Sequence, residues 1–118
     1  MIGLDRLMEM EGVIAAGQFS PEGKVIRAVG DLSEDEMAFT ARMCANQTRK
    51  LKTNIEQFSK ATMMDWRPLT GWAVWGGRYA VIVMGNTGVF IDPRYADCNQ
   101  LMVDLMGSEA TGPRPVNY

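Results

Sequence analysis

Apolar side chains recur every three or four residues over one long stretch of the chain, from Leu32 to about Met63. The stretch contains neither Pro nor Gly. At its start, Ser33 and Glu36 have the spacing of a capping box, and Leu32 and Met37 have that of a hydrophobic staple. This pattern predicts a helix roughly 40 Å long. A helix of that length is a candidate for contact beyond its own subunit.

The apolar positions of this helix fall on one stripe. The stripe consists of Met37, Ala41, Cys44, Thr48, Leu51, Ile55 and Phe58. Ala38, Met43 and Ala45 widen it in the first half, where small residues would allow another element to approach closely. The second half is thinner and more basic, so we expect it to project past the sheet.

Short apolar runs on both sides of the helix predict five strands. They cover residues 13–19, 24–29, 70–75, 79–84 and 89–91. The first two are joined by a turn at 20–23, in which Pro21 presets φ and Gly23 takes the positive-φ position. Gly76 and Gly77 form a second tight turn. The uninterrupted apolar run at 79–84 is typical of a central strand covered on both faces.

Short helices are predicted at both ends, over residues 3–10 and from about Asp97 to a stop at Gly107. Residues 108–118 are rich in Gly and Pro, and we expect a mobile tail there. The chain is therefore predicted to be a single α+β domain over residues 1–107. Its sheet should be mainly antiparallel, with helices on its faces.

Composition narrows the possible functions of the 118-residue chain. A net charge of −2 and an isoelectric point of about 5.1 disfavour nucleic-acid binding. The longest apolar run is too short to cross a bilayer. The first residues lack the basic and apolar regions of a signal peptide. We therefore expect a cytoplasmic protein without a membrane partner.

Candidate catalytic chemistry is sparse, because the chain has no histidine and its two cysteines lack metal-site spacing. Cys44, on the apolar stripe, is expected to be a small buried hydrophobe. Cys98 begins the last helix and is the weak redox candidate. The cytoplasm disfavours a disulfide between them. No catalytic, cofactor-binding or metal-binding residue is predicted, so we do not expect an enzyme.

Three stretches resemble the roadblock family of dynein light chains and their bacterial relatives. They are residues 12–17 with 20–23, the capped helix from Ser33, and residues 76–84. Segments 43–46, 68–77 and 84–90 more closely resemble a small roadblock-related family of bacterial proteins whose function is not established. The resemblance covers about residues 2–106, and none of these motifs carries catalytic chemistry.

The resemblance implies a profilin-like fold with strand order 2-1-5-4-3, the long helix on one face and the terminal helices on the other. It also implies a homodimer in which the third strands pair edge to edge and the long helices pack together. Carried onto this chain, the interface would comprise Met37, Ala41, Met43, Ala45, Trp72, Val74 and Trp75. Large apolar groups on an unpaired edge strand agree with this placement. The alternative is that both tryptophans pack under the helices of their own chain.

These observations lead to two functional hypotheses. The first is a non-enzymatic homodimeric scaffold or adaptor that binds another protein through a composite surface. The second is a sensor that holds a small ligand in a closed cavity of about 300 Å³ or more between sheet and helices. Arg49, Lys50 and Lys52 form a basic patch that is either a solvated face or a docking site for an acidic partner. Candidate partners are a small GTPase, beside which roadblock relatives often act, and a redox complex.

Overall fold

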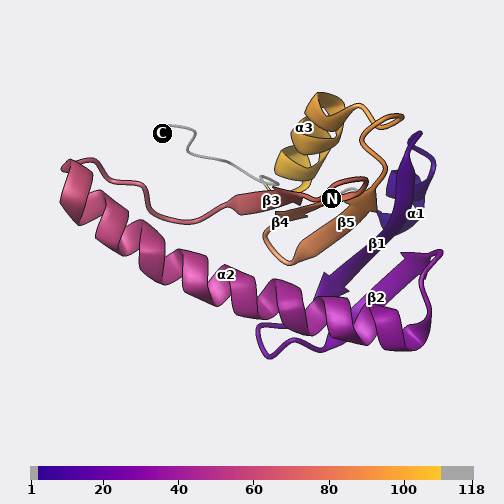
Figure 1. The fold of residues 1–118 in the computed structure, drawn as a ribbon, viewed down its shortest axis with the longest axis horizontal. Coiled ribbons are helices and arrows are strands. Elements are labelled where there is room, and N and C mark those ends of the chain that lie inside the picture. The colour runs from indigo at the N-terminus through magenta and orange to yellow at the C-terminus, as the bar shows by residue number, and fades with distance from the viewer. Residues whose placement is uncertain (1–2, 110–118) are drawn as a thin grey trace.

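The computed structural model describes residues 3–109, which form one five-stranded sheet and three helices (Figure 1). In chain order the elements are α1 (Leu4–Met8), β1 (Val13–Phe19), β2 (Val25–Gly30), α2 (Glu34–Thr62), β3 (Gly71–Trp75), β4 (Ala80–Met84), β5 (Thr87–Ile91) and α3 (Cys98–Glu109). Within these residues, no helix combines the length and the apolar character needed to cross a membrane.

The strand order is β2-β1-β5-β4-β3, and every neighbouring pair is antiparallel. This confirms the predicted order. The central pair joins distant parts of the chain, because β1 lies beside β5 with Val13 opposite Ile91 and Gln18 opposite Thr87. Gly17 marks a close backbone approach, since a Cβ there would lie 3.3 Å from the carbonyl oxygen of Arg27.

Each face of the sheet carries its own apolar core. On one face, α1 and α3 bury their leucines against the central strands. The buried residues of this core include Leu4, Leu7, Ile82, Ile91, Leu101 and Leu105. On the other face, α2 buries Ala41, Cys44 and Ala45 against Phe19 and Val83, and we call these five residues the α2-side core. The predicted placement of the helices is therefore confirmed.

The capping box at the start of α2 is present as predicted. The Ser33 hydroxyl accepts a hydrogen bond from the Glu36 amide at 3.1 Å, and the Glu36 carboxylate accepts one from the Ser33 amide at 2.8 Å. The helix ends at Thr62, where Met63 adopts the left-handed conformation with φ of 60°. Its C-terminal half extends beyond the sheet, and residues 63–70 return to β3 (Figure 1).

Several element boundaries differ from the sequence prediction by one or two residues, and those of β5 and α3 have a physical reason in the structure. β5 begins at Thr87 rather than residue 89, because the β4–β5 turn is shorter than predicted and Thr87 is buried. α3 continues through Gly107 to Glu109, because an interior glycine costs a helix only about 1 kcal/mol and Leu101 and Leu105 anchor this one. Of the tail expected at 108–118, residues 110–118 lie outside the described residues.

Candidate functional site

β3 is the outermost strand on one side of the sheet, and its outer edge has no strand partner among residues 3–109. It pairs with β4 alone, from Gly71 opposite Met84 to Trp75 opposite Ala80. Val74 is 51% exposed and Trp75 is 53% exposed. An open edge that carries exposed apolar side chains is a template for pairing with another chain.

The two tryptophans of β3 have different surroundings. Trp72 packs against the α2-side core, and its indole N–H donates a hydrogen bond to the Thr48 hydroxyl at 2.9 Å. The alternative of packing under the chain's own helix therefore holds for Trp72. Trp75 is exposed at the end of the strand. The contact between Trp72 and Thr48 also marks where α2 passes over β3.

The predicted interface residues on α2 also differ in how far they are exposed. Ala41 and Ala45 are buried in the chain's own α2-side core, and Met37 is half-buried. Met43 is exposed. Of the predicted interface residues, Met43, Val74 and Trp75 thus present the most surface to a second chain, and the interface itself stays a prediction.

Four exposed apolar residues lie at the projecting end of α2 and directly after it, and we call them the tip cluster: Phe58, Met63, Met64 and Trp66. The rings of Phe58 and Trp66 lie 4.9 Å apart between centroids. The indole N–H of Trp66 donates to the Thr62 hydroxyl at 3.1 Å, and its amide donates to the Ser59 hydroxyl at 2.9 Å. These bonds hold Trp66 against the end of α2. The sequence pattern did not reveal it, because its members meet only where the chain folds back onto the end of α2.

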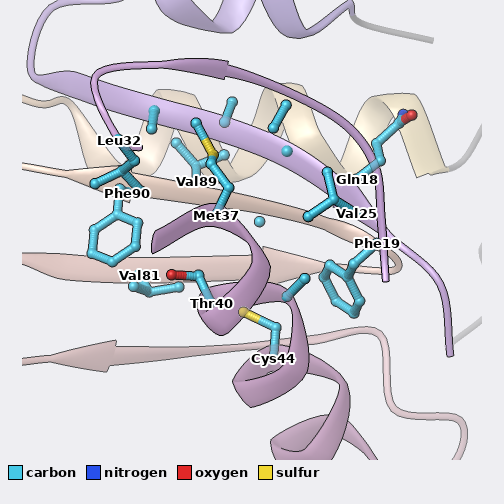
Figure 2. A pocket seen from close by; sticks show the side chains of 16 residues that line it. Gln18, Phe19, Val25, Leu32, Met37, Thr40, Cys44, Val81, Val89 and Phe90 are labelled. Carbon is cyan, nitrogen blue, oxygen red and sulfur yellow. The ribbon is translucent and has the colours of Figure 1, made fainter. Parts of the chain in front are cut away.

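The space between the first half of α2 and the sheet is small (Figure 2). Phe19, Met37, Thr40, Cys44 and Val89 are among the side chains around it, and it measures about 40 Å³. Ligand cavities typically measure about 300–1,000 Å³. This space does not supply the closed cavity that the sensor hypothesis requires.

The cysteines lie in different surroundings and are both free. Cys44 is 4% exposed, and burial raises the pKa of its thiol to about 11. It is therefore the inert small hydrophobe that the sequence predicts. Cys98 is the first residue of α3 and packs, half-buried, against the other core. Within residues 3–109, no group of three or more Cys, Asp or Glu residues could hold a metal ion.

The predicted basic patch lies where α2 leaves the sheet. Arg49 and Lys52 line a hollow of about 240 Å³ between α2 and the start of β3, which we call the α2–β3 groove, whereas Lys50 does not line it. One guanidinium nitrogen of Arg49 donates to the Pro21 carbonyl at 2.8 Å, and another donates to the Asn46 side-chain oxygen. The sequence identified the charges but not the groove.

A family model described as "Uncharacterized conserved protein (DUF2173)" matches residues 3–107. The chain belongs to the DUF2173 family. No curated protein matches this DUF2173 chain.

Solved structures share the fold of this DUF2173 chain. A roadblock/LC7 domain from Streptomyces avermitilis aligns with a TM-score of 0.73 and 17% identity, over 89% of each chain. The gliding protein MglB from Thermus thermophilus aligns with a TM-score of 0.69 and 13% identity, over 85% of this chain and 75% of that one. A structure described as "MglB with tetrameric arrangement" gives 0.71 and 13%, over 89% and 80%. The fold is therefore the roadblock fold, as the sequence resemblance implies.

Proposed function

We propose that this DUF2173 chain is a non-enzymatic adaptor that forms a homodimer and binds a second protein through a surface built from both chains. The observation that carries the proposal is the position of α2 relative to β3. The helix passes over this outermost strand at Thr48 and then continues to Thr62. No strand of the same chain lies on the outer side of β3 to support this part of the helix. About 14 residues extend beyond the sheet, which corresponds to roughly 20 Å.

If two chains pair along their β3 edges, the projecting part of each α2 can pack against the other chain. Antiparallel pairing about a twofold axis normal to the sheet keeps both α2 helices on the same face of a continuous ten-stranded sheet. Each projecting half would then lie over the β3 side of the other chain. Strands are spaced about 4.8 Å apart, so roughly 20 Å of helix reaches across several of them. Leu51, Ile55 and the tip cluster would thereby gain apolar contacts.

The composite surface of the proposed dimer would include the outer faces of the two α2 helices. Phe39 is exposed there, and the Arg42 guanidinium lies over the Phe39 ring at 5.8 Å from its centroid. Aromatic residues, Met and Arg are enriched in protein interfaces. We propose that this surface acts in the cytoplasm on a protein partner, for which a small GTPase and a redox complex remain the candidates.

The comparisons support self-association of this fold in one respect. The described tetrameric arrangement belongs to MglB, and it is consistent with a roadblock fold that assembles through its own surfaces. The space of about 40 Å³ beneath α2 favours the adaptor over the ligand sensor. The absence of histidine from the sequence likewise favours a role without general acid–base catalysis.

The test is the oligomeric state of a Val74→Asp variant, measured by light scattering coupled to size exclusion. Val74 is half-exposed on β3, so the substitution leaves the core intact but places a charge at the proposed seam. We expect the native protein at twice its chain mass of 13.1 kDa and the variant at the single-chain mass.

Ile26→Asp is the matched control. Ile26 is 60% exposed on β2, the outermost strand at the opposite side of the sheet. This variant should remain a dimer. A dimeric Val74→Asp protein, or a monomeric Ile26→Asp protein, would show that β3 does not form the seam.

A further inference from the structure

We infer that the α2–β3 groove binds a short segment of a partner protein in which a large apolar side chain lies next to one or two carboxylates. This inference rests on the adaptor proposal for the existence of a partner, but it needs only one chain. It names the chemistry of the partner segment.

The shape of the groove suits a single large side chain. Its apolar lining comes from four separate parts of the chain and includes Phe19, Ala45, Leu69, Trp72 and Val83. Its volume of about 240 Å³ lies below the range of about 300–1,000 Å³ that is typical of small-molecule sites. An anchoring side chain of a peptide, with its neighbouring backbone outside, fits a site of this size.

The charge of the groove specifies the neighbours of that side chain. Asp and Glu outnumber Lys and Arg by 14 to 12 in the whole chain, yet no acidic residue lines the groove. Arg49 and Lys52 do line it, one helical turn apart on α2. Lys52 takes part in none of the ion pairs found among residues 3–109. A carboxylate beside the anchor would therefore meet two cations with no intramolecular carboxylate in competition.

The groove is formed before a partner arrives. Hydrogen bonds from Arg49 to the Pro21 carbonyl and to Asn46 hold its guanidinium between α2 and the β1–β2 turn. The bond between Trp72 and Thr48 fixes the indole beneath the helix. Side chains that are already ordered lose little conformational entropy on binding, which increases the affinity that a short segment can reach.

The groove also remains open in the proposed dimer. Pro21, Gly85 and Asn86 contribute to its lining, and they belong to turns at the end of the sheet. The proposed seam runs along the outer edge of β3 instead. Pairing of two β3 edges would therefore leave an entrance at the strand ends, and each dimer would present two grooves.

A random octapeptide phage library, selected against the purified full chain, tests the inference. We expect the enriched peptides to carry Asp or Glu next to Phe, Trp, Leu or Met. A synthetic peptide of the consensus should bind Lys52→Glu at least about tenfold more weakly than it binds the native chain, and Arg49→Glu/Lys52→Glu more weakly still. Added NaCl should weaken binding to the native chain, because salt screens exposed charges.

Lys50→Glu is the matched control, since it makes the same charge change two residues away on α2 but outside the groove. It should bind the consensus peptide like the native chain. Lys52→Glu removes no side-chain hydrogen bond among the described residues, so its thermal unfolding should match that of the native chain. Its fold and its binding can therefore be judged separately. Enrichment of no consensus, a consensus without acidic residues, or equal binding by Lys52→Glu would overturn the inference.

The same samples distinguish this inference from the dimer proposal. Light scattering should give the same mass for Lys52→Glu and for the native chain. A monomeric native chain that still selects the acidic–apolar consensus would overturn the dimer alone. A dimer that selects no consensus would overturn the groove alone.

Discussion

Among single residues, burial separates the side chains that support the fold from those that can meet a partner. Cys44 and Trp72 both have functional groups. The Cys44 thiol is enclosed by the α2-side core, however, and the Trp72 indole N–H already donates a hydrogen bond to the Thr48 hydroxyl. Trp75, three positions further along the same strand, is exposed. Alternation along β3 predicts opposite faces for these tryptophans, but only the position of α2 shows which face is covered.

The thiol of Cys44 gives a prediction for stability against pH. Burial raises its pKa from 9.0 to about 11, so the folded state favours the neutral form. Above about pH 9 the unfolded chain ionises first, and the contribution of Cys44 to the free energy of unfolding should fall between pH 9 and 11. The loss is about 2–3 kcal/mol at most. Urea unfolding of the native chain and of Cys44→Ala at several pH values measures it.

The Cys44→Ala variant should lose less stability than the native chain over this pH range, whatever its stability at pH 7. Parallel pH profiles would contradict the prediction. In the native state at pH 8, we also expect Cys44 to react with a thiol reagent far more slowly than in urea.

Among the elements, α2 shows what a sequence can specify about local structure. Its N-terminus was predicted to the residue because Ser33 and Glu36 satisfy each other's amides within four positions of the chain. The α2–β3 groove could not be predicted in this way. Its walls come from Phe19, from the middle of α2 and from residues 69–72, and only folding brings these segments together. The tip cluster escaped prediction for a related reason, since Trp66 folds back onto Ser59 and Thr62.

The capping box gives a prediction at this scale. Ser33→Ala removes the acceptor for the Glu36 amide and should lower the free energy of unfolding by about 1 kcal/mol. Gln57→Ala, at an exposed position within the same helix, should change it by less than about 0.5 kcal/mol. Urea denaturation followed by circular dichroism measures both. Equal effects of the two substitutions would show that the capping box does not contribute measurably to the stability of the protein.

At the scale of the whole molecule, the projecting helix determines the shape. The described chain extends over 42 × 28 × 28 Å, and α2 accounts for the long dimension (Figure 1). The strand order 2-1-5-4-3 was available from the family resemblance but not from spacing alone. Hairpins predict that β1 lies beside β2 and β4 beside β5. Placing β5 against β1 depends on packing between the two halves of the chain.

The proposed dimer makes thermal stability depend on protein concentration. Because association stabilises the folded state by mass action, the Tm of the native chain should rise over a hundredfold increase in concentration. The Tm of Val74→Asp should stay constant over the same range. Differential scanning fluorimetry or calorimetry measures both, and a concentration-independent Tm for the native chain would argue against the dimer.

The pairing of β1 with β5 also affects how the chain folds while the ribosome synthesises it. β1 is completed at Phe19, but its central partner begins only at Thr87. At a translation rate of about 5–20 residues per second, β1 waits for several seconds with one edge open. α2 is synthesised during this interval, and its N-terminal cap is local in sequence. We therefore expect α2 to cover one face of the β1–β2 hairpin before the second half of the sheet emerges.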